Sequence, residues 1–459
     1  MSLVYCVDFG STFTKAALVD VDTGELVGTA THRTTLETDV LDGWDAIRSE
    51  LLDLAASRPE APIPVLACSS AGGGLRIAVV GNEELVTAEA GRRVALSSGG
   101  RVVHVSSDAV DLAALRQSTP DVVLLVGGTD GGNAEVLLAN ATALAGSSWA
   151  GPVVVAGNRE AVDEIGAGFE RSGVPFVVAP NVVPRIGVLT PEGARAAIRE
   201  MFLTHVIGGK HLSARADFTA MVKGATPDIV LTAVELLAGG LGPERPGAGD
   251  VVVVDVGGAT TDVHSVVEVD PEDAGLAREV VATVPVSRTV EGDLGMRWSA
   301  VPTVAAAAAA GLELAADVAA AAEARRRDPG LVPDSPAEVE HDLAIASAAV
   351  GLAVRRHAGR QQVVFSPEGR LVERSGKDLR EVDLLVGSGG VLRHNSDADA
   401  KRVLSAATGD HVLGGWLMPR APRVVIDHDY VLAAAGLLAA DHPEVAYALL
   451  HRLVRSGEG

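Results

Sequence analysis

The stretch 250–262 constrains the chain most, because four consecutive valines lead into Asp255, two glycines and two threonines. Four β-branched residues are too few for an ordinary helix, and they predict a buried strand. Gly257 and Gly258 have no Cβ, so backbone N–H groups of the turn can approach an anion closely. The alternative is a tight hairpin whose glycines only permit a positive φ. The residues expected to contact phosphate are Gly257, Gly258, Ala259, Thr260 and Thr261.

The N-terminus repeats this pattern. A predicted strand leads into Asp8, a glycine, a hydroxyl pair and a second strand that carries Lys15. Two aspartate-led hairpins far apart in the chain predict two halves of a duplicated domain that close on one nucleotide. Mg²⁺ binds through few carboxylates and keeps several waters, so Asp8 and Asp255 are predicted to hold the hydrated ion. The expected phosphate contacts of this hairpin are Gly10, Ser11, Thr12 and Lys15.

Several other classes of function are excluded. No Gly-x-x-x-x-Gly-Lys-Ser/Thr occurs, and no Gly-x-Gly-x-x-Gly follows a strand and opens a helix, which excludes P-loop and Rossmann sites. The formal charge of −22 argues against nucleic acid or an anionic membrane as a partner. No apolar run reaches the ~18 residues that a membrane span needs.

The cysteines and histidines offer no metal centre. Cys6 and Cys68 are predicted to fill the core, which indicates a reducing cytoplasm. His264 and His394 lie beside glycine motifs, but neither has a second histidine or cysteine at metal-ligand spacing. We therefore predict that both histidines are structural or face solvent.

Periodicity along the rest of the chain predicts alternating strands and helices. The triple glycine 72–74 fits either a flexible loop or a ligand contact, and a hairpin turn is expected at 367–370. The expected strands are 64–67, 122–126, 153–156, 175–178, 251–254, 262–269, 280–286, 381–386 and 424–426. The expected helices include 44–56, 159–169, a segment from Thr226, a segment from the capping box 335–338 to His357, and 430–440.

The two hairpins, 8–15 and 255–262, resemble the phosphate 1 and phosphate 2 motifs of the actin, Hsp70 and sugar-kinase superfamily. The segment Gly387, Ser388, Gly389 and Gly390 is similar to the adenosine motif of the same superfamily. This resemblance implies an α/β chain with a duplicated actin-like (ribonuclease H-like) ATPase fold that binds ATP and Mg²⁺ between two lobes. The first lobe would span 1–240, with a family-specific elaboration at 100–222 that offers a surface for a partner. The second lobe would span 250–459.

Longer strings resemble the glutamate (methylaspartate) mutase accessory family, GlmL or MutL. These strings are 69–76, 127–133, 181–189, 255–264 and 288–295, and the match runs to about residue 437. The resemblance implies a slowly hydrolysing ATPase that acts as a chaperone-like reactivase on an adenosylcobalamin-dependent mutase, releasing damaged cobalamin. The chain has no Asp-x-His-x-x-Gly pattern, so the sequence does not itself indicate a cobalamin site.

The sequence does not decide which residue orients the attacking water. In the superfamily the helix before phosphate 2 can present it, and Thr226 and Asp228 are the positions available. Hsp70-type chains place a glutamate before the proline, so with Thr226 there we expect slow hydrolysis. The sequence favours a helix-capping role for Thr226 and Asp228 over the water-orienting role. Asp130 fits either a group that positions water or magnesium, or a helix N-cap cluster with Asn133.

Two rival functions fit the same superfamily. A small-molecule kinase would transfer phosphate to a sugar or carboxylate and would need a base, which Asp130 or Asp228 could supply. An actin-like filament former would need self-complementary exposed apolar loops.

Overall fold

The first sheet is built around the N-terminal strand in a computed structural model, which describes residues 2–55, 62–147, 149–268, 284–366, 369–410, 412 and 414–456. The strand order is β3-β2-β1-β4-β10. The first three strands pair antiparallel, and β4 and β10 run parallel to β1. The bounds are β1 Leu3–Phe9, β2 Phe13–Asp20, β3 Glu25–Arg33, β4 Val65–Ser69 and β10 Val222–Ala225.

The second sheet repeats this arrangement. Its order is β15-β14-β13-β18-β19, with an antiparallel hairpin pair followed by two strands parallel to β13. The bounds are β13 Val251–Val256, β14 Thr261–Val266, β15 Val286–Glu291, β18 Leu384–Ser388 and β19 Arg423–Ile426. Two sheets with one strand order confirm the predicted duplicated α/β fold.

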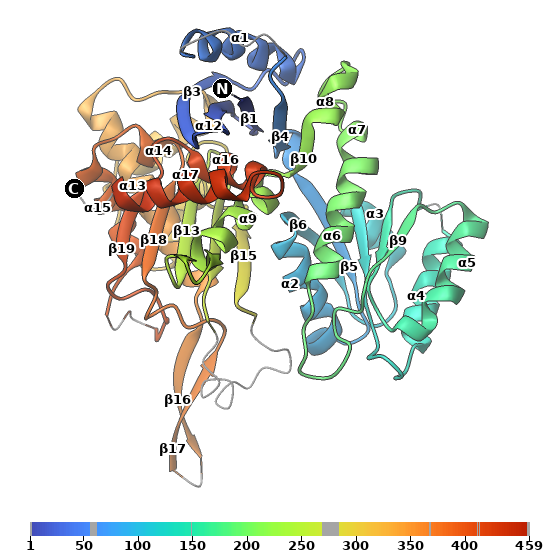
Figure 1. Cartoon of the computed structure of the whole chain (residues 1–459). Coiled ribbons are helices and arrows are strands. Elements are labelled where there is room, and N and C mark those ends of the chain that lie inside the picture. Colours follow the sequence, from blue (N-terminus) through green and yellow to red (C-terminus); the bar gives the residue numbers. More distant parts are fainter. Residues whose placement is uncertain are drawn as a thin grey trace.

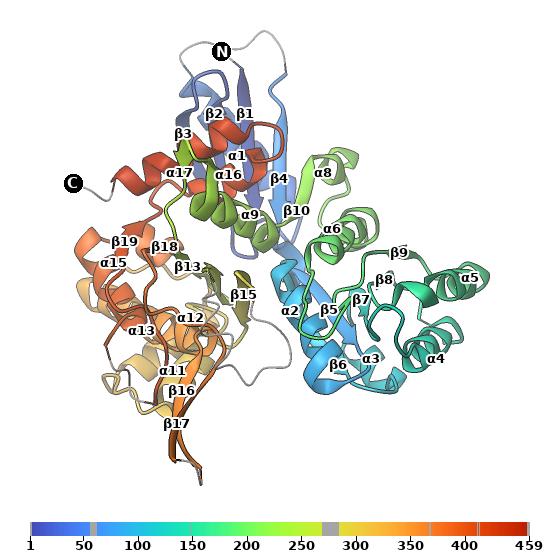
Figure 2. The same ribbon diagram turned by 60° about the horizontal axis from the view of Figure 1, so that its bottom comes forward.

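A third sheet lies to the right of the other two in Figures 1 and 2, with the order β6-β5-β7-β8-β9 and all strands parallel. The bounds are β5 Leu75–Val80, β6 Gly100–Ser106, β7 Val122–Leu125, β8 Val153–Val155 and β9 Phe176–Val178. Its first strand comes before the interval 100–222 that we expected to form an elaboration, and the chain returns to the first sheet at β10. The lobe boundaries themselves stay a prediction.

Helices cover the sheets and connect their strands. Those of the N-terminal half are α1 Val40–Asp53, η1 Ala71–Gly73, η2 Glu84–Ala88, α2 Glu89–Ser97, α3 Leu112–Gln117, α4 Glu135–Ala145, η3 Arg159–Ala161, α5 Val162–Ser172, α6 Glu192–Met201, η4 Phe202–Val206, α7 Ile207–Gly209, α8 Ala216–Met221 and α9 Thr226–Gly239. Those that follow are α11 Ala300–Ala309, α12 Val318–Arg327, α13 Pro336–His357, α14 Gly390–Arg393, α15 Asp397–Leu404, η5 Ser405–Ala407, α16 Val431–Leu438 and α17 Pro443–Ser456. Among the described residues no helix has the length and apolar character needed to span a bilayer.

Two small hairpins complete the described elements, β11 Gly240–Gly242 with β12 Arg245–Pro246, and β16 Arg360–Ser366 with β17 Gly369–Ser375. The second of these projects from the body at the bottom of Figure 1. Residues 367 and 368 of the expected turn lie outside the described residues, as does most of the expected strand 280–286. Among the described residues, the strand that pairs with β14 is Val286–Glu291.

Helices α9 and α16 lie between the first two sheets. One apolar cluster joins Val4 and Cys6 of β1, Val251 and Val253 of β13, and the buried faces of these helices. Cys6 and Cys68 are both free and buried, as expected of core residues. Because the same helices support both sheets, the ends of β1 and β13 face one shared space.

A buried histidine makes the second half sensitive to acid. His357 hydrogen-bonds Ser265 at 2.8 Å and Thr289 at 3.0 Å, and burial lowers its pKa to about 3, with Lys377 adding to the shift. In the unfolded chain the imidazole of His357 is protonated below about pH 6.5, whereas in the folded protein it stays neutral at that pH. The stability that neutral His357 contributes is therefore complete above about pH 6.5 and is lost as the pH falls below it. We expect the unfolding free energy to fall by about 1.4 kcal/mol per pH unit from this group.

Urea unfolding at pH 7 and pH 5.5 tests this expectation. His357→Gln should have a smaller difference between the two pH values than the wild type, whereas the exposed His205→Gln should keep the wild-type difference. An unchanged difference in His357→Gln would contradict the assignment.

Candidate functional site

The two aspartate-led hairpins line one cavity of about 550 Å³. The first sheet supplies Asp8, Gly10, Ser11, Thr12 and Lys15. The second sheet supplies Asp255, Gly257, Gly258, Ala259 and Thr260, and the segment after β18 supplies Gly389 and Gly390. The structure therefore brings together most of the residues that the sequence predicted to contact a nucleotide. Their roles in binding stay predictions.

The turns of the two hairpins have the same local structure. The N–H of Gly10 donates to the carbonyl of Phe13 at 3.2 Å, and that of Gly257 donates to Thr260 at 2.9 Å. A Cβ on Gly10 would lie 2.6 Å from the Phe13 carbonyl oxygen, and the same close approach occurs at Gly257. The turns thus need glycine because side chains would not fit. The two hairpins lie close together, since the Thr12 hydroxyl is 3.1 Å from where a Cβ of Gly258 would be.

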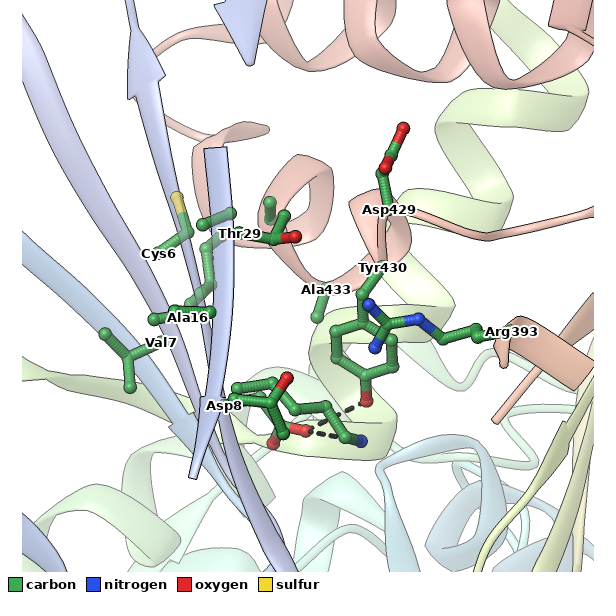
Figure 3. A pocket seen from close by; sticks show the side chains of 15 residues that line it. Cys6, Val7, Asp8, Ala16, Thr29, Arg393, Asp429, Tyr430 and Ala433 are labelled. Atoms are coloured by element: carbon green, nitrogen blue, oxygen red, sulfur yellow. Dashed lines mark hydrogen bonds and ion pairs between the residues drawn. The ribbon is translucent and has the colours of Figure 1, made fainter. Parts of the chain in front are cut away.

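Asp8 is surrounded by hydrogen-bond donors from distant parts of the chain. Its carboxylate accepts the hydroxyl of Tyr430 at 2.9 Å and that of Thr226 at 2.5 Å. Lys15 lies 3.5 Å away and the Cys68 thiol 3.6 Å away. Figure 3 shows Asp8, Tyr430 and Arg393 converging from three elements. Because Asp8 is only 3% exposed, these contacts fix its orientation at the cavity wall.

Asp255 has a different environment. It pairs across its hairpin with Asp262, whereas the equivalent partner of Asp8 is Lys15. The pKa of Asp255 is raised to about 6, chiefly by burial; Lys15 opposes the shift, and the nearby Asp262 and Asp8 add to it. Several carboxylates gathered at one place disfavour the ionised form unless a cation joins them. This arrangement therefore suits a cation.

Tyr430 was not found from the sequence. It has a left-handed backbone, with φ 56° and ψ 39°, just before α16, whose first N–H groups are capped by Asp427. Its ring has the Lys15 ammonium 3.9 Å from the centroid and the Arg393 guanidinium at 5.1 Å. Burial raises the pKa of Tyr430 well above its ordinary value, so the hydroxyl stays a donor to Asp8. No local motif marks this residue, because its partner lies more than 400 positions earlier.

Replacing Tyr430 by phenylalanine should lower the free energy of unfolding by about 1–3 kcal/mol, because a buried hydrogen bond to a charged group is lost while the ring contacts remain. Urea denaturation measures this change. The control is Tyr447→Phe, whose exposed hydroxyl bonds Pro246. If both variants lost the same free energy of unfolding, the hydrogen bond from Tyr430 to Asp8 would contribute no more stability than the exposed bond of Tyr447.

The structure corrects the capping role that the sequence favoured for Thr226. No side chain caps the start of α9, and the Thr226 hydroxyl is directed to Asp8 instead. Asp228 is buried and does not line the cavity. Its carboxylate pairs instead with Arg199 at 2.5 Å and with Arg195 at 3.9 Å. Both residues lie at the N-terminus of α9, but only Thr226, Pro227 and Val230 of that helix reach the cavity.

Asp130 also lies outside the lining of the cavity. Its carboxylate accepts the side-chain amide of Asn181 at 2.9 Å and the backbone N–H of Arg159 at 3.2 Å. The side chain of Asn133 accepts the N–H of Glu135, while the N-cap residue of α4 is Ala134, which has no capping side chain. The geometry thus places Asp130 in a structural network at the edge of the third sheet.

Three further predicted residues border the cavity without lining it. Gly387 and Ser388 are buried in β18, while Gly389 turns with a φ of 108° toward the cavity. Thr261 is fully buried, and its hydroxyl has no partner among the described residues. In contrast, Gly73 and Gly74 line the cavity, which favours the ligand-contact alternative for the triple glycine.

A nucleotide with a hydrated magnesium ion fits this site. Within the described ranges no group of three or more histidine, cysteine, aspartate or glutamate side chains could hold an ion by itself. Two carboxylates beside glycine turns instead match an ion that keeps water and phosphate ligands. Because Gly10 and Gly257 carry no side chains, an anion can approach the backbone of each turn directly.

Comparison with known proteins finds one extended likeness in sequence. A family model described as MutL protein matches residues 4–454. Protein MutL of Clostridium tetanomorphum is 36% identical over 460 residues, which cover 98% of this chain and 99% of that protein. Among solved structures, nucleotide-free acetone carboxylase is 14% identical with a TM-score of 0.42, covering 96% of this chain and 70% of that one. Component A of the Acidaminococcus fermentans (R)-2-hydroxyglutaryl-CoA dehydratase is 9% identical, with a TM-score of 0.31 and coverage of 97% and 100%.

Proposed function

The chain belongs to the MutL protein family, and from this membership we propose that it is an ATP-binding, slowly ATP-hydrolysing accessory protein. Its partner would be an adenosylcobalamin-dependent mutase such as glutamate mutase, which it would reactivate. The observation that carries the ATPase proposal is the cavity in which hairpins from two equivalent sheets meet.

Each wall of the cavity has a role in this proposal. The turns at Ser11 and Gly258 offer backbone N–H groups to phosphate oxygens, and Lys15 offers a positive charge. The bare backbone of Gly389 and Gly390 accommodates the adenosine. Asp8 and Asp255 would hold a hydrated Mg²⁺, which when bound neutralises charge on the phosphates.

Slow hydrolysis is supported by the carboxylates that surround the cavity. Besides Asp8 and Asp255, those in its described lining are Asp262 and Asp342. Asp262 binds Arg288 at 2.7 Å and Asp342 binds Arg297 at 2.9 Å, so neither is free to orient water. The Thr226 hydroxyl is directed to Asp8. An ATPase without a well-placed water-orienting group turns over slowly and suits a switch.

Nucleotide state can change the shape of such a protein. The two phosphate turns come from different sheets, so loss of the terminal phosphate removes contacts that bridge them. The sheets can then rotate relative to each other and alter a partner bound across them.

The function is tested with the full chain and a holo-mutase inactivated by cyanocobalamin. We expect basal ATP hydrolysis that the mutase stimulates, and recovery of mutase activity with ATP and adenosylcobalamin but not with a non-hydrolysable ATP analogue. ATP consumption that requires a small metabolite would favour the kinase, and ATP-dependent pelleting would favour the filament former. The proposal would be refuted if the protein showed no ATPase activity and restored the activity of none of several B12-dependent mutases.

A further inference from the structure

One wall of the cavity lies beyond the phosphate turns. Along β14 and β15, alternate side chains face opposite sides of the sheet. Ser265 and Thr289 contact His357 of α13 on one side, whereas His264 and Arg288 line the cavity on the other. His264 and Arg288 are direct neighbours across the two strands. This wall therefore places two nitrogen-bearing side chains next to each other.

Both side chains are buried and incompletely satisfied. His264 is 1% exposed and Arg288 is 4% exposed. Two Arg288 nitrogens bind Asp262 and the carbonyl of Leu96, but its Nε has no partner among the described residues, nor has the Nδ1 of His264. Buried polar groups are almost always paired in folded proteins. These two unpaired nitrogens belong to neighbouring side chains in one wall of the cavity.

The opposite side of the same space supplies a free cation and bare backbone. Arg101 of β6 is exposed, lines the cavity, and has no ion pair within the part of the chain that the structure describes. Its guanidinium carbon lies 3.4 Å from where a Cβ on Gly292 would be, so it reaches the end of β15. Gly73 and Gly74 also line this space, and no heavy atom lies within 4 Å of where their Cβ atoms would be.

We propose that this part of the cavity binds a second, anionic ligand beside the nucleotide, through a carboxylate or phosphate group held by Arg101, with Arg288 and His264 in the adjoining wall. Guanidinium groups match both oxyanions with paired, charge-assisted hydrogen bonds. Asp262 already balances the charge of Arg288, so Arg101 supplies the uncompensated charge. The ligand would lie between the second sheet, through β14 and β15, and the third sheet, through β6. The inference rests on the proposed function, because a nucleotide fills the neighbouring part of the cavity.

His264 adds selectivity rather than charge. Burial, with Arg288 nearby, lowers the pKa of His264 well below its ordinary value, so the imidazole is neutral. A neutral ring offers one donor and one acceptor. A ligand with a hydroxyl or amino group next to its anionic group would therefore bind better than a simple anion.

Calorimetry on the full chain tests the second site. The protein is first saturated with a non-hydrolysable ATP analogue and Mg²⁺, then titrated separately with inorganic phosphate and with succinate, which distinguish the two oxyanions. We expect the wild type to bind at least one of the two anions. In Arg101→Gln the affinity for that anion should fall about tenfold, because one charge-assisted hydrogen bond is lost. Nucleotide affinity should stay unchanged in that variant. The matched control is Arg92→Gln, an exposed arginine on α2 that pairs with Glu89.

Each other outcome is decisive. Normal nucleotide binding without anion binding below about 10 mM would overturn the second site alone. The second site would also be overturned if Arg101→Gln and the wild type bound the anion with equal affinity. The same holds if phosphate bound only by displacing the nucleotide. Failure of the wild type to bind the nucleotide would instead overturn the proposed function and, with it, the pairing of two ligands.

Discussion

An Asp255→Asn variant should lose Mg²⁺-dependent ATP hydrolysis by well over about tenfold, while its free energy of unfolding stays equal or rises. The amide keeps the shape of the side chain but cannot carry the charge that attracts a cation. Burial and the neighbouring carboxylates raise the pKa of Asp255 to about 6, so its ionised form is disfavoured in the folded protein and neutralising it costs no stability. Activity should therefore fall without any loss of stability.

The same substitution at Asp8 should give a different pattern. Turnover should again fall by more than about tenfold, but stability should also fall, because buried hydroxyls of Tyr430 and Thr226 donate to this carboxylate. Steady-state ATP hydrolysis and urea denaturation measure both quantities. The control is Asp45→Asn, which removes an exposed ion pair with Arg215. Near-normal turnover in either cavity variant would refute the metal role assigned to that residue.

Replacing Gly389 by alanine should weaken ATP binding by more than about tenfold and lower the free energy of unfolding by about 1–3 kcal/mol. Gly389 has a φ of 108°, and a Cβ there would collide with the carbonyl oxygen of Val256 on the neighbouring strand. Relief of that collision must move the end of β18 away from β13, and with it the pairing of Ser388 with Asp255. The change would therefore disturb the adenosine segment and the phosphate turn together.

The adjacent glycine gives a matched control. Gly390 also lines the cavity, but it has no positive φ and no heavy atom lies within 4 Å of where its Cβ would be. Gly390→Ala should unfold at nearly the wild-type urea concentration. If thermal shift with ATP and urea denaturation found the two variants alike, backbone strain at Gly389 could not be the cause.

The hairpins were predictable because their physics is local. Four valines, an aspartate and two glycines in sequence specify a strand and a turn wherever they occur, and the same holds around Asp8. Two copies of one pattern then predicted two equivalent sheets, which the matching strand orders confirm. Residues that lie within a few positions of each other thus gave both the fold class and the phosphate turns of the cavity.

Side-chain partners across the cavity were not predictable, because they come from elements that meet only after folding. Tyr430 and Thr226 reach Asp8 from helices that begin more than 200 positions away. Asp228 was expected near the reaction but is held by Arg199, whose position depends on how α6 packs against α9. Local sequence determined where backbone and carboxylates could meet phosphate. Tertiary packing alone decided which carboxylates stay available, since burial and charge pairing depend on neighbours distant in the chain.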